Sequence, residues 1–264
     1  MKKRFAFKPA AMLLAAAGVA AFTTTAQATE VFQNTDLILG YTSQAKPDAV
    51  LGSGTSDKKS TSLRFEHFGI HGFGDNYFFA EDIKGHQVGG ATAGSFGFDA
   101  KNQYVLVWNA RASLSKLTGT KISAGPIDDV SLMYRMERAS YANYDADMSG
   151  PSFNLKLPGF AWFQTSFLLN KQNHSFANAD DKKAHLFWHT YAILPFELGG
   201  AKFTFSPLLW VNFAKGTGGT ETYIEPDLWV KLGDSSVDLG FRAQYHHQKN
   251  YSRTSPTLMA RWNF

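Results

Sequence analysis

The stretch SPTLMARWNF, residues 255–264, decides the fold. Its residues alternate between an apolar and a polar set: Leu258, Ala260, Trp262 and Phe264 against Thr257, Met259, Arg261 and Asn263. Successive side chains of a β-strand point to opposite faces of the sheet, so this alternation predicts a strand with one apolar and one polar side.

The strand ends on an aromatic residue of the apolar face, Phe264. Bacterial outer-membrane β-barrels typically close on such a strand, and the barrel-assembly machinery recognises its terminal Phe. We therefore expect that machinery as a partner, bound through Phe264, and outer-membrane lipid around the barrel. A water-soluble β-sandwich or lipocalin-like barrel has the same alternation, so the rest of the chain has to distinguish these folds.

The first residues have the pattern of a signal peptide. Lys2, Lys3, Arg4 and Lys8 precede an apolar stretch over 10–22, and Ala26-Gln27-Ala28 forms an A-x-A cleavage site. The apolar stretch is too short for a membrane-spanning helix, which needs roughly 20 residues. We predict that residues 1–28 are cleaved after Ala28 and that residues 29–264 form a multi-pass barrel in the bacterial outer membrane.

Charge and cysteine content exclude several classes of function. Four of the 26 Lys and Arg residues lie in the predicted signal peptide and none of the 22 Asp and Glu, so the remainder carries 22 of each sign. A neutral mature chain gives no reason to expect nucleic acid as a partner. The chain has no Cys, which excludes disulfides, thiolate zinc sites and a thiol nucleophile. We expect no cofactor, no metal site and no enzymatic activity.

The alternating pattern recurs along the whole predicted mature chain. Val237, Leu239 and Phe241, for example, alternate with Asp238 and Arg242. The pattern predicts twelve strands, near 36–43, 60–69, 74–83, 104–114, 128–140, 150–157, 161–172, 184–196, 202–214, 221–232, 236–248 and 255–264. The predicted fold class is therefore all-β.

The predicted connections alternate in length. Short turns with Gly or Pro are expected near 70–73, 158–160, 197–201 and 233–235, and longer polar loops near 44–59, 84–103, 141–149 and 173–183. The connection 115–127 is an exception, a longer link on the short-turn side. Outer-membrane barrels have short periplasmic turns and long outer loops. An even strand number then predicts a transmembrane antiparallel β-barrel with both termini in the periplasm.

Twelve strands enclose a narrow lumen, between the filled interior of eight strands and the open channel of sixteen. The polar residues at alternate strand positions are predicted to line the lumen. They are Arg64, Glu66, Arg111, Arg135, Glu137, Asp227, Lys231, Arg242, Gln244, His246 and Arg261. Both signs of charge occur, so strong ion selection is not expected, and many of these groups are expected to pair with one another. A neutral, hydrogen-bonding solute suits such a wall.

Aromatic residues divide between the two faces. Trp262 and Phe264 are expected at the periplasmic rim, and Phe213 and Tyr245 near the outer rim. The alternation places Trp162, Trp210 and Trp229 at positions that face the interior. They either pack as a plug inside a narrow barrel or form a stacking surface for a flat, uncharged ligand.

Two segments carry a resemblance to a known family. Residues 61–83 (TSLRFEHFGIHGFGDNYFFAEDI) and 110–140 (ARASLSKLTGTKISAGPIDDVSLMYRMERAS) resemble the Tsx-type nucleoside-specific channels and related OmpK-like outer-membrane proteins. The resemblance implies a twelve-stranded barrel that admits nucleosides and deoxynucleosides and serves phages as a receptor through its outer loops. Only Glu66 and Phe68 are placed by a matching motif, because residues 141–254 match the barrel pattern alone.

These observations predict a passive nucleoside channel, with substrate contacts at Glu66, Phe68, Trp162, Trp210, Trp229, Asp227, Arg242 and Gln244. One alternative is a non-conducting structural or adhesive barrel. Another is an outer-membrane acyl hydrolase, which needs Ser and His two residues apart on the lipid face of a strand. His174 and Ser175 are adjacent, Ser166 has no His on its strand, and His246 and His247 point to opposite faces, which also argues against a metal site there.

Overall fold

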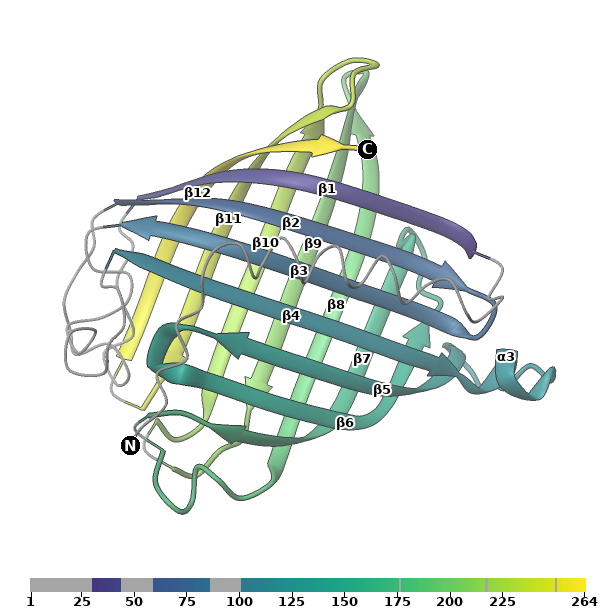
Figure 1. Cartoon of the computed structure of the whole chain (residues 1–264). Helices are drawn as coiled ribbons and strands as arrows, with labels where there is room; N and C mark the ends of the chain where they lie inside the picture. The colour runs from purple at the N-terminus through teal and green to yellow at the C-terminus, as the bar shows by residue number, and fades with distance from the viewer. Residues whose placement is uncertain (1–29, 44–58, 86–100, 176, 217, 250) are drawn as a thin grey trace.

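The structure, a computed structural model, describes residues 30–43, 59–85, 101–175, 177–216, 218–249 and 251–264 (Figure 1). In these residues twelve antiparallel strands form a closed barrel, in which each strand pairs with its neighbours in the chain and β1 closes on β12. The predicted signal peptide and the predicted loop 44–59, apart from Lys59, lie outside the described residues.

The strands are long enough for a membrane-spanning barrel, in which about 9–11 residues cross the bilayer. They are β1 (Glu30–Ser43), β2 (Lys59–His71), β3 (Gly74–Gly85), β4 (Asn102–Ser113), β5 (Ile127–Ala139), β6 (Tyr144–Leu155), β7 (Trp162–Asn173), β8 (His185–Leu198), β9 (Ala201–Asn212), β10 (Glu221–Lys231), β11 (Val237–Gln248) and β12 (Tyr251–Asn263). The predicted twelve-stranded all-β barrel is confirmed.

One predicted connection is wrong. Residues 144–149 belong to β6, and the chain turns instead through the 3-10 turn η2 (Tyr141–Asn143), where Ala142 and Asn143 have φ of 51° and 49°. The start of β6 is hidden in the sequence because its outward positions carry Asp145 and Asp147 rather than apolar residues. The strand pattern is therefore weak at this point, although the backbone pairing is continuous.

The barrel exposes large apolar side chains on its outer surface and buries charged side chains in its interior. Leu258 and Leu169 are each 63% exposed on the outer surface, and Leu132 is 60% exposed. Arg111 and Arg242, by contrast, are buried in the interior at 2% and 5% exposure. A water-soluble barrel has the opposite arrangement, with its apolar side chains inside, so the structure does not fit the lipocalin-like alternative.

The two ends of the barrel differ. At one end, here called the turn end, are the first residue of β1, the last residue of β12 and the connections 72–73, 114–126, 156–161, 199–200 and 232–236. The longer connection 114–126 is on the predicted side and contains α3 (Leu114–Thr118), which extends away from the barrel in Figure 1. The other end, here called the loop end, includes the connections 174–184 and 213–220.

The first and last strands close the barrel in register. Leu37 faces Trp262 and Leu39 faces Ala260, so the apolar residues of the last strand share the outer face with those of β1. The backbone N–H of Phe264 donates to the carbonyl of Thr35 at 2.9 Å, and its ring stacks on Trp262. None of the helices in the described residues has the length and apolar character needed to cross a membrane.

Candidate functional site

The interior contains a cluster of charges centred on Arg242 of β11. Its Nε and Nη2 donate to the two carboxylate oxygens of Asp227 on β10 at 2.7 and 2.6 Å. Nη2 also lies 3.1 Å from Oε1 of Glu225, which is two residues before Asp227 on β10. The planar guanidinium matches the carboxylate fork, which fixes the geometry of the group as well as its charge.

This cluster reaches across the interior. Arg64 on β2 donates from Nη2 to Glu81 on β3 at 3.0 Å, and its Nη1 lies 4.0 Å from Oε1 of Glu225. In the closed sheet β2 and β10 are separated by β1, β12 and β11, so the Arg64–Glu225 approach spans the lumen. We call this group the charge bridge, made up of Arg64, Glu81, Glu225, Asp227 and Arg242.

Other predicted lumen charges also have partners. They pair mainly with residues on their own or a nearby strand: Arg111 with Asp75 at 2.5 Å, Arg135 with Glu137 at 3.0 Å, Arg261 with Asp238 at 2.5 Å and His246 with Glu221 at 2.5 Å. Buried charges are tolerated when they are paired and hydrogen-bonded, so the predicted pairing accounts for most of the polar wall.

A second crossing of the lumen is aromatic. The rings of Phe68 on β2 and Trp162 on β7 meet edge to face, with centroids 5.6 Å apart. Four strands, β3 to β6, lie between them along the shorter way around the sheet. The guanidinium of Arg111 lies 5.0 Å from the Trp162 ring centroid. Trp162 is the first residue of β7, which places this pair near the turn end.

Toward the loop end four side chains from neighbouring strands form what we call the aromatic ladder. Trp210 stacks between Phe187 and Tyr223, with centroid distances of 5.6 and 5.1 Å, and His246 lies 6.2 Å from Trp210. Because both faces of Trp210 are covered by its neighbours, the ring edge is the part available to a ligand. The ladder lies next to the charge bridge, since the Tyr223 hydroxyl donates to Glu225.

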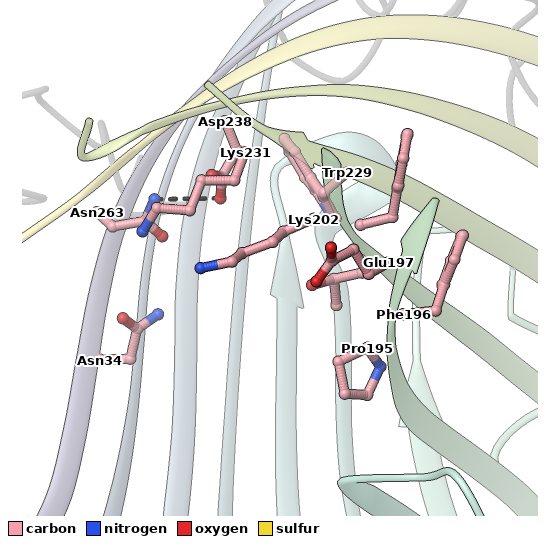
Figure 2. A pocket seen from close by; sticks show the side chains of 11 residues that line it. Asn34, Pro195, Phe196, Glu197, Lys202, Trp229, Lys231, Asp238 and Asn263 are labelled. Atoms are coloured by element: carbon pink, nitrogen blue, oxygen red, sulfur yellow. Dashed lines mark hydrogen bonds between the residues drawn. The ribbon is translucent and has the colours of Figure 1, made fainter. Parts of the chain in front are cut away.

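Trp229 does not belong to either aromatic group. It is 3% exposed and packs with Ile38 and Met259. The Arg261 guanidinium lies over its ring at 4.3 Å from the centroid. Trp229 lines a cavity of about 650 Å³ at the turn end, together with the predicted pore residue Lys231 (Figure 2).

The predicted substrate contacts thus fall into separate places. Asp227 and Arg242 lie in the charge bridge, and Gln244 joins it by donating to Glu225 at 2.8 Å. Glu66 accepts a hydrogen bond from the Tyr77 hydroxyl at 3.0 Å. The remaining predicted contacts are divided between the aromatic ladder, the turn-end aromatic pair and the turn-end cavity: Trp210; Phe68 and Trp162; Trp229.

The prediction left out several residues that the structure places among these groups. They are Asp75, Tyr77, Glu81, Glu221, Tyr223 and Glu225. Glu221, Tyr223 and Glu225 alternate in step with the predicted lumen residues of β10, and Asp75, Tyr77 and Glu81 occupy alternate positions of β3, so alternation could have identified them. The joining of Arg64 to Glu225 depends on how the barrel closes and has no signal in the sequence.

The hydrolase alternative needs a Ser and a His on the outer face, and Ser166 does not lie on that face. Ser166 is fully buried in the interior, where its cross-strand partner is His189 on β8, also buried. Its hydroxyl donates to Ser152 at 2.8 Å. His174 and Ser175 follow the end of β7. Within the described ranges, no group of three His, Asp or Glu residues is arranged to hold a metal ion.

No protein-family model and no curated protein matches the chain. The barrel is similar to solved outer-membrane proteins. One is the KdgM porin, with 8% identity over 87% of this chain and 99% of the porin at a TM-score of 0.46. A second is the translocator domain of the autotransporter NalP from Neisseria meningitidis, with 11% identity over 97% and 96% of the two chains at 0.41.

The outer membrane protein Omp33 of Acinetobacter baumannii is a third, with 8% identity over 88% of this chain and 99% of Omp33 at a TM-score of 0.39. Similarities this distant say nothing about what passes through the barrel. The function has to be argued from the interior of this chain.

Proposed function

We propose that this chain is an outer-membrane barrel that forms a narrow, passive channel selective for nucleosides and deoxynucleosides. The observation that carries the proposal is the aromatic ladder beside the charge bridge, in which ring edges and paired polar groups face one confined lumen. The turn end would face the periplasm and the loop end the exterior.

The membrane location is supported by the outer surface. Apolar side chains as exposed as Leu258 and Leu169 would be unfavourable in water but are the expected lipid-facing residues of a transmembrane barrel. A closed barrel also satisfies its backbone hydrogen bonds between strands, which a bilayer requires because it offers no water to unpaired N–H and C=O groups.

A neutral passenger is supported by the pairing of charges. The charge bridge contains two guanidinium groups and three carboxylates, all held within one network of contacts. An ion entering this network would have to compete with partners already in place. A neutral solute with hydroxyl groups can instead exchange hydrogen bonds with the wall, for example with the Gln244 amide.

A flat passenger is supported by the aromatic ladder. Aromatic rings prefer edge-to-face or offset contacts, so a nucleobase can lie with its face on the edges of Trp210 and Tyr223. Edge-to-face aromatic contacts are worth about 0.5–1.5 kcal/mol each beyond the area that they bury. Ribose alone lacks this contact, which makes the base the part of the molecule that is selected.

Ion current through the purified protein in a planar bilayer tests the proposal. A nucleoside should reduce the current, whereas ribose at the same concentration should not. Trp210→Ala should weaken the block about tenfold, the effect of losing roughly 1.4 kcal/mol. Trp188→Ala is the matched control, because Trp188 donates to Thr165 and stacks on exposed Phe167, outside the lumen. Equal block by ribose and nucleoside would refute nucleoside selectivity.

A structural barrel without conductance is the second candidate. It is favoured by the two contacts that cross the lumen, Phe68 with Trp162 and Arg64 with Glu225. The same bilayer experiment separates the candidates. Absence of current from protein that is folded and inserted would favour the structural barrel, while current blocked by nucleoside would favour the channel.

A further inference from the structure

The cavity at the turn end has its own chemistry, separate from that of the charge bridge. It has a volume of about 650 Å³, which is within the range of roughly 300–1,000 Å³ for small-molecule sites. Its polar lining comes from six strands: Asn34, Glu197, Lys202, Thr204, Lys231, Asp238 and Asn263. Figure 2 shows the lysine side chains extending toward the side of the cavity that carries Asn34 and Asn263.

The two lysines are side by side. Strands β9 and β10 are paired as far as Phe203 and Val230, so the next residues, Lys202 and Lys231, occupy neighbouring positions at the ends of these strands. Like charges directly opposite each other in a sheet destabilise the pair. This arrangement is therefore unfavourable unless something of opposite charge compensates it.

The acidic neighbours are not in contact with the two ammonium groups. Asp238 faces Lys231 across β10 and β11, but its carboxylate is bound by Arg261 at 2.5 Å and by the Asn263 amide at 3.1 Å. Glu197 faces Lys202 across β8 and β9. Within the part of the chain that the structure describes, neither lysine has a carboxylate within 4.0 Å.

We propose that this cavity is a binding site for the phosphate group of a small solute, held between the ammonium groups of Lys202 and Lys231. Lysine binds phosphate as a point charge. Two ammonium groups match the charge of a phosphate dianion better than they match that of a carboxylate, which carries one negative charge. The Thr204 hydroxyl lies in the same lining and can donate to a phosphate oxygen. The volume leaves room for an ester group beside the phosphate.

Binding of inorganic phosphate to the purified full-length protein, followed by isothermal titration calorimetry in detergent, tests the site. We expect saturable binding, weakened about tenfold by Lys202→Gln or Lys231→Gln and abolished by the double variant. Lys121→Gln is the matched control, since Lys121 is an exposed lysine at the same end that pairs with Asp128 outside the cavity. Heat-modifiable gel mobility verifies that each variant is folded.

Absence of saturable binding by the wild-type protein would overturn the proposal. So would a folded double variant that binds phosphate as tightly as wild type, or an equal loss in Lys121→Gln. Acetate provides the test of ligand class: it should bind at least tenfold more weakly than phosphate, and equal affinity would refute the assignment to phosphate. None of these outcomes depends on whether nucleosides pass through the lumen.

Discussion

Glu225 is the residue on which the interior network converges. Its carboxylate contacts Arg242 at 3.1 Å and Arg64 at 4.0 Å, and it accepts hydrogen bonds from Gln244 and Tyr223. At 5% exposure it has little water around it, so these partners stabilise its charge. Contacts from three strands therefore depend on one carboxylate.

Replacing Arg242 tests how strongly this network supports the barrel. Arg242→Leu would leave Asp227 and Glu225 as buried carboxylates without their main cation, and we expect unfolding to become easier by about 3–5 kcal/mol. Urea unfolding in lipid vesicles measures the change. The double variant Arg242→Leu with Asp227→Leu should recover part of the loss. A change below about 1 kcal/mol, as for an exposed ion pair, would contradict this expectation.

At the scale of elements, each strand separates two environments by alternation alone. On β12, Leu258 faces outward with 63% exposure, while its neighbours Thr257 and Met259 are buried inside. The same alternation places Phe65 outward and Arg64 inward on β2. The alternation along each strand therefore determines which side chains lie on the outer surface and which face the lumen.

Arginine substitutions at two depths on the outer face of β12 test whether this face lies against a bilayer. Leu258→Arg, near the middle of β12, should lower the free energy of unfolding in lipid by about 2–4 kcal/mol, because a guanidinium there enters the hydrocarbon region. Thr254→Arg, on the same face nearer the loop end, should cost only about 0–1 kcal/mol. Equal effects at both positions would argue against a bilayer around this face.

The contact between β2 and β7 gives a second prediction at this scale. Phe68→Ala removes the ring that meets Trp162 across the lumen, so single-channel conductance should increase as the turn end widens. Phe65→Ala is the control, because Phe65 is on the same strand but 37% exposed on the outer surface. Unchanged conductance in Phe68→Ala, or the same increase in both variants, would show that this pair does not limit the passage.

The whole molecule has two different ends, and the proposed orientation assigns one to each side of the membrane. Strand β1 begins and strand β12 ends at the turn end, where the short connections 199–200 and 232–236 also lie. The connections 174–184 and 213–220 are at the opposite end. An outer-membrane barrel with periplasmic turns would therefore expose residues 174–184 on the cell surface.

Single-cysteine labelling on intact cells tests this orientation, and the chain has no Cys of its own to interfere. Lys182→Cys, in an exposed part of the loop-end connection, should react with a membrane-impermeant maleimide. Asp234→Cys, exposed at the turn end, should react only after the outer membrane is permeabilised. Labelling of Asp234→Cys instead of Lys182→Cys on intact cells would mean that the barrel is inverted.

The sequence by itself determined the number of strands, and it predicted a face for each proposed lumen residue, because the two-residue period of a strand is a local property. It missed the beginning of β6, where Asp145 and Asp147 interrupt the outer apolar pattern. Only the tertiary structure decided which inward residues meet. Arg64 and Glu225 meet although 161 positions separate them. Trp210 and Trp229 both occupy inward-facing positions, but Trp210 stacks on Tyr223 whereas Trp229 packs with Ile38 and Met259. Parity fixes the direction of a side chain, whereas its partner across the lumen depends on the register and closure of all twelve strands.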